Sequence, residues 1–334
     1  CSPRKEYALY PGTLSYKYPV AGQPNSRLTL HSYDIETRKN KTITLANGNY
    51  EYIPRIYSTP ESDKILAVTL NRDQNRMEIY AVNPKSTLSS SIYVDQAQNA
   101  WIEPDAYEAL RIMPQSFILS SSRSGYRHYY EYSYSGALIR QITSGDYDVT
   151  ALSGYDADSQ TYYMQSCRNG AVNRTLSSID RKGQIKDISP AQGCASAIFS
   201  PNAKYYLESY SSLSQAPSYI LKSAKGKEIK NFGDNTAYAQ QYASLPRQEL
   251  STVEVNGVKL NVILVKPANM SPGKKYPLII NQYSGPGSQE VLDRWSPDWT
   301  RYFATQGYAV ATIDPHGTGG RGRAFMDAVY CKLG

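Results

Sequence analysis

Two nearly continuous apolar runs, Tyr276-Pro-Leu-Ile-Ile-Asn-Gln-Tyr283 and Gly307-Tyr-Ala-Val-Ala-Thr-Ile-Asp314, decide the fold of the C-terminal part of the chain. Such continuous runs are typical of parallel strands that helices bury on both faces. The segment 258–265 alternates between apolar and polar residues, as a strand with one exposed face does. Between the two runs we expect a short helix over 298–306, closed by Gly307. Together these segments predict a sheet of the α/β type.

From Leu250 onward the order of strands and helices matches the first part of an α/β-hydrolase domain, which we place at 248–334. A serine hydrolase of this class carries its nucleophile on a sharp strand-to-helix turn written G-x-S-x-G, and its acid and histidine follow later. The sequence contains no G-x-S-x-G segment, and no histidine follows His316. We therefore expect a piece of an enzyme, truncated before its nucleophile and inactive by itself.

The region before Leu250 repeats a unit of strand, polar turn and strand. Five such hairpins are expected over 28–45, 77–94, 129–143, 176–188 and 219–230. Tyr33 precedes Tyr80 by 47 residues, and the turn glycines Gly136, Gly183 and Gly226 follow one another at 47 and 43 residues. Units of roughly 40–50 residues, each holding about four strands, are the signature of β-propeller blades.

The physics of a four-stranded unit supports the propeller interpretation. One such sheet cannot bury both of its faces alone, so neighbouring sheets must cover each other. Apolar segments such as 64–70 and 116–120 are the expected inner strands. A plain β-sandwich with accidental spacing is the alternative. Because a closed ring usually has more blades than the five hairpins provide, we expect an incomplete propeller over 1–247, in a chain that is mainly β plus α/β.

Composition excludes several classes of protein. The net charge of +7 over 334 residues is mild and is not gathered into one run, so we expect no nucleic-acid partner. No apolar stretch approaches the ~20 residues of a membrane-spanning helix. Tyrosine is unusually frequent, at 31 residues against 5 phenylalanines, which favours half-buried strands whose hydroxyl groups meet water.

The four cysteines are too widely spaced to predict a metal site. Cys1, Cys167, Cys194 and Cys331 form no C-x-x-C pair, and we expect neither metal nor cofactor. A disulfide between Cys167 and Cys194 and two free thiols are both compatible with the sequence. Cys1 is compatible with the lipid-bearing residue of a processed lipoprotein and with the start of a gene fragment, and we favour the fragment.

Two glycine-rich loops follow the apolar strands. Ser284-Gly-Pro-Gly-Ser288 occupies the loop whose groups face the developing oxyanion in α/β-hydrolases, although a turn without chemistry fits the same residues. The cluster Gly317-Thr-Gly-Gly-Arg-Gly322 partly matches a dinucleotide fingerprint, but no βαβ unit with a suitably placed acidic residue follows it. We interpret it as a structural turn that lets a helix pack closely on the sheet.

Several segments carry a family resemblance. Tyr16-Lys-Tyr-Pro-Val-Ala-Gly-Gln-Pro-Asn25, Ser124-Gly-Tyr-Arg-His128 and the segments 141–149 and 199–206 resemble the propeller of the dipeptidyl peptidase IV family, bacterial branch. The stretch 274–289 resembles the start of that family's hydrolase domain, and Asp314 to Gly322 resembles its next strand end. The similarity is collinear over essentially the whole chain, which is more specific than any single motif.

The resemblance implies a proline-specific serine exopeptidase with an eight-bladed propeller above an α/β-hydrolase domain. It implies that Tyr283 donates its hydroxyl to the oxyanion, a role that suits a neutral phenol. It also implies peptide substrates with proline or alanine at the second position, a homodimeric parent protein, and a periplasmic or secreted location. A prolyl tripeptidyl peptidase of the same family and a non-enzymatic propeller that binds peptides are the alternatives.

Several positions depart from the family pattern. Relatives read D-G-R-G where this chain reads Asp314-Pro-His-Gly317, so the turn is expected to differ. The stretch 101–107 stands where relatives place a Phe-Arg substrate contact, and no role carries over. The family's catalytic triad is expected beyond Gly334, and the paired glutamates that hold the substrate amine are expected before Cys1. We interpret His316 as a loop histidine and His31 and His128 as structural.

Overall fold

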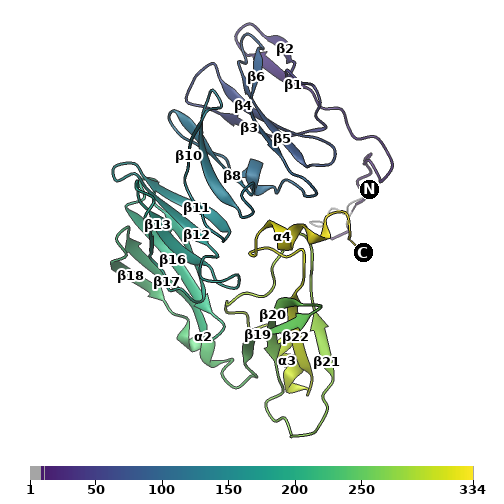
Figure 1. Cartoon of the computed structure of the whole chain (residues 1–334), viewed down its shortest axis with the longest axis vertical. Coiled ribbons are helices and arrows are strands. Elements are labelled where there is room, and N and C mark those ends of the chain that lie inside the picture. The colour runs from purple at the N-terminus through teal and green to yellow at the C-terminus, as the bar shows by residue number, and fades with distance from the viewer. Residues whose placement is uncertain (1–8, 11, 334) are drawn as a thin grey trace. The chain divides into compact units, whose positions relative to one another are not determined.

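The computed structural model describes residues 9–10 and 12–333 (Figure 1). It divides into two compact units, Cys1–Gln96 and Ala97–Gly334. The domain boundary predicted at 247/248 falls inside the second unit, which contains both blade-like sheets and the C-terminal sheet. That boundary stays a prediction. Cys1 and the hypotheses about it lie outside the described residues.

The first unit is built from antiparallel strands. A two-stranded sheet pairs β1 (Leu30–Asp34) with β2 (Lys39–Ile43), and a four-stranded sheet follows in the order β3 (Tyr52–Ser58), β4 (Ile65–Leu70), β5 (Arg76–Val82), β6 (Ser89–Gln96). The two sheets share a core, in which Leu30, Ile43 and Leu45 pack with residues of β4 and β5 such as Ala67 and Tyr80. Each sheet thus covers a face of the next, as the blade argument requires.

The second unit begins with a short helix, α1 (Asp105–Glu108), and three four-stranded antiparallel sheets. Their strands are β7 (Arg111–Ile112), β8 (Ser116–Ser121), β9 (His128–Ser133) and β10 (Leu138–Gln141); β11 (Val149–Asp156), β12 (Thr161–Ser166), β13 (Thr175–Ile179) and β14 (Ile185–Asp187); and β15 (Cys194–Phe199), β16 (Tyr205–Ser212), β17 (Gln215–Ser223) and β18 (Glu228–Gly233). In each sheet the strands pair in chain order. This arrangement confirms a mainly β chain made of successive four-stranded antiparallel sheets, as expected for propeller blades.

All five predicted hairpins are present, as the pairs β1–β2, β5–β6, β9–β10, β13–β14 and β17–β18. The turn glycines explain part of the repeat. Gly136, Gly183 and Gly226 have φ values of 89°, 79° and 84°, a left-handed region that side chains other than glycine rarely adopt. A tight turn at the same place in successive hairpins therefore imposes the same residue at a regular interval.

Neighbouring sheets of the second unit pack through aromatic and aliphatic side chains. Ile118 and Tyr129 of one sheet share a core with Val149, Tyr162 and Met164 of the next. At the following interface Tyr163 stacks on Phe199, with ring centroids 4.5 Å apart. Gly154 lies against that ring, and a Cβ there would approach it to 2.8 Å. Tyrosines such as Tyr129, Tyr162 and Tyr163 thus fill the space between sheets.

The C-terminal sheet has the strand order β19 (Gln248–Val255), β20 (Val258–Val265), β22 (Ala309–Asp314), β21 (Leu278–Asn281) (Figure 1). β19 and β22 pair antiparallel with β20, and β21 pairs parallel with β22. The parallel pair was expected from the two apolar runs. Burial on both faces holds for β22 but is wrong for β21, where Leu278 and Ile280 are 55% and 61% exposed. β21 is the edge strand, and no described element covers the face that these two side chains share.

The helices of the second unit are short. Besides α1 they are α2 (Thr236–Gln240), α3 (Trp299–Thr305), α4 (Arg323–Met326) and the 3-10 helix η1 (Asp327–Val329). The predicted helix before Gly307 is α3, and Asp298 caps it by accepting a hydrogen bond from the Thr300 amide at 3.0 Å. Among the described residues, no helix has the length and apolar character needed to cross a membrane.

The cysteines of the described chain are free thiols. Cys167 is buried, Cys194 is half-buried and Cys331 is exposed. Burial raises the pKa of both the Cys167 and the Cys194 thiol. Of the two possibilities left open by the sequence, the structure therefore has the unpaired thiols, in a protonated form that is poorly nucleophilic.

Candidate functional site

Two loops meet at the carboxyl edge of the parallel strand pair. One loop follows β21 and the other follows β22, and they are joined by hydrogen bonds from the Gly287 amide to the Gly317 carbonyl and from the Gly319 amide to the Ser288 carbonyl, both 2.8 Å. In open α/β sheets, ligands bind outside the carboxyl ends of the strands. This edge is therefore the candidate functional site of the described chain.

Asp314, the last residue of β22, anchors the loop that follows β21. Its Oδ1 accepts a hydrogen bond from the Glu290 amide at 2.9 Å, and its Oδ2 accepts one from the Val291 amide at 3.0 Å. The side chain is buried, and this burial raises the pKa of the Asp314 carboxyl against the opposing effect of the two amides. The carboxylate thus fixes the end of the loop to the strand next to β21.

Tyr283, the predicted oxyanion donor, lies two residues beyond β21 at this edge. Its side chain is 72% exposed, and its ring lies over Gly285, where a Cβ would approach Cε1 to 2.6 Å. The turn that follows Tyr283 is tight, because Ser284 has a φ of 61°. Tyr283 was the single catalytic residue predicted from the sequence, and the structure places it on the surface of the candidate site. Its role stays a prediction.

Two backbone amides of the predicted oxyanion loop, those of Gly287 and Ser288, are already engaged. The Ser288 amide and hydroxyl both donate to the Gly285 carbonyl, at 3.0 and 2.6 Å. The Gly287 amide donates to Gly317, so it is not available to a ligand in this arrangement. The side chain of Tyr283 is therefore a better candidate for an oxyanion donor than the Gly287 amide.

The glycine cluster serves close packing. A Cβ on Gly319 would lie 2.8 Å from the Gly287 carbonyl oxygen, and one on Gly322 would lie 2.9 Å from the Gly125 carbonyl oxygen. Gly322 also has a φ of 75° and precedes α4, a helix of only four residues. These contacts are with backbone atoms that cannot move aside, which supports the interpretation as a structural turn.

The histidines have the surroundings expected of non-catalytic residues. His316 is exposed and packs edge-on against Phe325, with ring centroids 4.8 Å apart. His128 is buried, and its Nε2 lies 2.8 Å from the Gly145 carbonyl oxygen, an atom that can only accept a hydrogen bond. Nε2 is therefore the donor, and Nδ1 of the neutral ring accepts from the Thr143 hydroxyl at 3.1 Å. Burial lowers the pKa of His128, in agreement with the neutral ring.

Two carboxylates tie the site loops to the blade-like sheets, and sequence reasoning missed both. Asp148 accepts hydrogen bonds from the Arg127 amide of its own region at 2.8 Å and from the Gly322 amide of the glycine loop at 3.0 Å. Asp293 accepts from the Gly193 and Leu213 amides, both at 2.9 Å. No local pattern marks these aspartates, because the partners that join the separate elements, Gly322 for Asp148 and Gly193 and Leu213 for Asp293, lie 80 to 174 residues away in the chain.

A third tie involves Gln289, at the end of the loop after β21. Its Nε2 donates to the Ala171 carbonyl at 2.8 Å, and its Oε1 accepts from the Arg174 guanidinium. Beside this contact is a cavity of about 110 Å³, which Glu103, Arg174, Gln289 and Arg323 help to line. Burial raises the pKa of Glu103, while the Arg323 and Arg127 charges oppose that rise. The stretch 101–107, to which the sequence assigned no role, thus supplies a carboxyl group to the candidate site.

Family profiles and curated relatives match this chain over most of its length. The profile of the dipeptidyl peptidase IV N-terminal region matches residues 2–217, and that of the prolyl oligopeptidase family matches residues 295–334. A probable dipeptidyl peptidase 4 of Aspergillus flavus is 27% identical over 360 residues, covering 97% of this chain and 45% of the relative. A probable dipeptidyl-aminopeptidase B of Arthroderma otae is 28% identical, covering 100% of this chain and 39% of the relative.

Solved structures agree with these matches. The structure of Porphyromonas gingivalis dipeptidyl peptidase 4 superposes with a TM-score of 0.91 at 36% identity, covering 100% of this chain and 48% of that protein. A putative dipeptidyl aminopeptidase IV of Bacteroides ovatus has the same fold, with a TM-score of 0.80 at 23% identity. The chain spans about half the length of the relatives it matches, or somewhat less. Since the first profile covers most of the sequence, the chain belongs to the dipeptidyl peptidase IV family.

Proposed function

We propose that this chain forms part of a proline-specific serine exopeptidase that releases N-terminal dipeptides. In this proposal 1–247 is a partial β-propeller, and 248–334 is the first part of an α/β-hydrolase domain. The observation that carries the proposal is the position of Tyr283 at the carboxyl edge of a parallel strand pair, on a loop tied to the blade-like sheets. Peptide substrates with proline or alanine at the second position, a homodimeric parent and a periplasmic or secreted location belong to the same proposal.

In this function Tyr283 donates its hydroxyl to the carbonyl oxygen of the scissile bond as negative charge develops there. A phenol is a neutral donor, so its hydrogen bond strengthens as the oxyanion forms. Its exposure leaves the hydroxyl open to a substrate that approaches from outside the loop. The chain itself has no G-x-S-x-G segment and no histidine after His316, so the nucleophile and base must come from elsewhere in the parent protein.

The test uses Gly-Pro-p-nitroanilide as substrate. The purified 334-residue chain should release no p-nitroaniline above background, and hydrolysis by it would contradict the proposed division of the catalytic residues. In the longer peptidase, Tyr283→Phe should lower kcat by about 10²-fold or more with a small change in KM, since one oxyanion donor is lost. Equal kcat values for the two forms would remove Tyr283 from the mechanism.

A second substrate separates the two kinds of exopeptidase. The parent protein should prefer Gly-Pro-p-nitroanilide over Ala-Ala-Pro-p-nitroanilide, both with free amino termini. A preference for the longer substrate would indicate a prolyl tripeptidyl peptidase instead. Failure to cleave either substrate would favour a propeller that binds peptides without hydrolysing them.

A further inference from the structure

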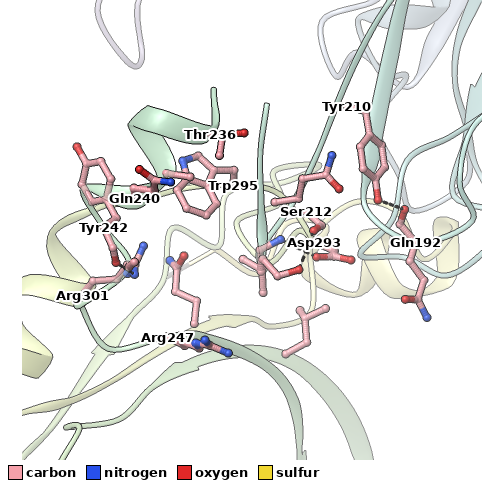
Figure 2. A pocket seen from close by; sticks show the side chains of 17 residues that line it. Gln192, Tyr210, Ser212, Thr236, Gln240, Tyr242, Arg247, Asp293, Trp295 and Arg301 are labelled. Carbon is pink, nitrogen blue, oxygen red and sulfur yellow. Dashed lines mark hydrogen bonds between the residues drawn. The ribbon is translucent and has the colours of Figure 1, made fainter. Parts of the chain in front are cut away.

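A polar cavity of about 730 Å³ lies beside the last blade-like sheet, and Tyr283 is not among the residues that line it. Its wall comes from the loops before β15 and after β16, from α2 and the turn that follows it, and from the segment Asp293–Arg301. Figure 2 shows Tyr242, Gln240 and Trp295 gathered on one side of it and Tyr210 and Gln192 on the other. The volume lies within the range of sites that bind small ligands.

One cation in this wall, the Arg301 guanidinium, is buried, and part of it already donates hydrogen bonds to backbone carbonyls. Arg301 is 6% exposed; its Nε donates to the Pro246 carbonyl at 2.9 Å, and its Nη2 donates to the Tyr242 carbonyl at 2.6 Å. Its Nη1 makes no hydrogen bond to any residue in the described part of the chain. Burial lowers the pKa of Arg301, and the charge of Arg247 lowers it further. The two guanidinium groups are thus near enough to repel each other.

The second cation, Arg247, is unpaired. It lines the cavity, it is exposed, and within residues 9–10 and 12–333 it forms no ion pair or hydrogen bond. The acidic residue of the lining is Asp293, and both of its oxygens already accept backbone hydrogen bonds from Gly193 and Leu213. The lining therefore contains two guanidinium groups and one carboxylate whose oxygens already accept hydrogen bonds. This composition gives the cavity an excess of positive charge, which favours an anionic group.

The remaining wall suits a peptide chain. Gln215, Gln240 and Gln248 line the cavity, and each side-chain amide offers both a donor and an acceptor, as a peptide group does. The rings of Tyr242 and Trp295 meet edge to face with centroids 6.5 Å apart, which gives an apolar surface for a ligand side chain. The positive charge, the amide groups and the aromatic rings of the lining complement the carboxylate, the peptide groups and an apolar side chain of a short peptide with a free carboxyl end.

We propose that this cavity binds a short peptide by its C-terminal carboxylate, with Arg247 as the main contact of the carboxylate. The glutamine amides pair with the peptide groups, and the Tyr242–Trp295 wall contacts an apolar side chain. Tyr283 does not line this cavity, and binding here involves no peptide hydrolysis. The binding proposal can therefore fail without affecting the proposed function, and the proposed function can fail without affecting it. A free inorganic anion shares the same charge chemistry and is distinguished in the test.

The experiment is isothermal titration calorimetry of the 334-residue chain with N-acetyl-Ala-Gln-Ala, whose blocked amino end prevents exopeptidase cleavage. The free acid should bind, and the C-terminal amide of the same peptide should bind at least tenfold more weakly. Arg247→Gln should weaken binding of the acid at least tenfold, whereas Arg181→Gln should leave it unchanged. Arg181 is a matched control because it is also exposed, and it lies in the β13–β14 turn, outside the cavity lining.

Arg247→Gln removes no hydrogen bond or ion pair within the described chain, so it should fold as the parent does, which circular dichroism checks. Three results would each overturn the proposal: equal affinity for the acid and the amide, unchanged affinity in Arg247→Gln, or inorganic phosphate alone binding as tightly as the acid. The last of these would indicate an anion site without preference for a peptide.

Discussion

The carboxylate of Asp293 offers the sharpest test of how the C-terminal segment is held to the blade-like sheets. Its Oδ2 accepts a hydrogen bond from the Gly193 amide and its Oδ1 accepts one from the Leu213 amide, each at 2.9 Å. The two amides are not equivalent. Gly193 has a second acceptor in Asn173 Oδ1, at 3.0 Å, whereas Leu213 has none among the described residues. Asp293→Ala should therefore affect the two amides unequally.

The expected magnitude follows from these contacts. A hydrogen bond to a charged group contributes about 1.5–3 kcal/mol, and the lower end applies here because Asp293 is only half-buried. Loss of about 2 kcal/mol at Leu213 corresponds to roughly 30-fold faster amide exchange. Gly193 keeps its bond to Asn173, so its exchange should change by only a few fold. Asp293→Asn retains one acceptor oxygen and should fall between the parent chain and the alanine variant.

Hydrogen–deuterium exchange resolved to single amides measures both effects in one sample. Asp146→Ala is the matched control, because Asp146 is exposed and its carboxylate accepts no hydrogen bond from the described residues. It should change neither rate, since such surface substitutions usually alter stability by less than about 0.5 kcal/mol. If Leu213 exchanges at the parent rate in Asp293→Ala, then Asp293 does not hold this loop in solution.

Two further predictions concern the packing of the site loops and the buried histidine. Gly319→Ala should destabilise the chain by about 1–3 kcal/mol in urea denaturation, because its Cβ would lie 2.8 Å from the Gly287 carbonyl oxygen; an unchanged midpoint would contradict that contact. Burial lowers the pKa of His128 from 6.5, so the unfolded chain binds a proton that the folded chain does not. The stability of the chain should therefore fall as the pH drops below about 6.5. Melting temperatures measured between pH 8 and pH 5 should fall less in His128→Gln than in the control His31→Gln, which alters an exposed histidine.

Much of the fold could be predicted because its signals are local. A strand that alternates, a turn glycine with positive φ and a second strand all lie within about twenty residues, so each hairpin is visible in the sequence. The interval from Gly136 to Gly183 then repeats because successive sheets are built alike. The parallel pair β21–β22 was likewise visible as two apolar runs.

The exposed face of β21 could not be predicted from its apolar run. Ile280 is an apolar residue of the kind that is usually buried, and its exposure depends on which elements cover the sheet. Hydrophobic pattern reports what a strand can bury, whereas burial itself depends on its neighbours in space. The resemblance placed Tyr283 at the end of a strand, and Tyr283 lies two residues beyond β21, while its role stays a prediction. The resemblance contained no information on Gln289 or on the aspartates that hold the loops.

The sequence by itself determined the order of strands, the hairpin interval, the family and the position of Tyr283 after its strand, because each depends on residues close together in the chain or on collinear similarity. Only the tertiary structure decided which side chains join the loops to the sheets. Asp148 accepts a hydrogen bond from Gly322, 174 residues away, and Arg247 and Arg301 line the same cavity. No local sequence pattern indicates either arrangement. Such contacts arise from how separate elements pack, and packing is a property of the folded chain as a whole.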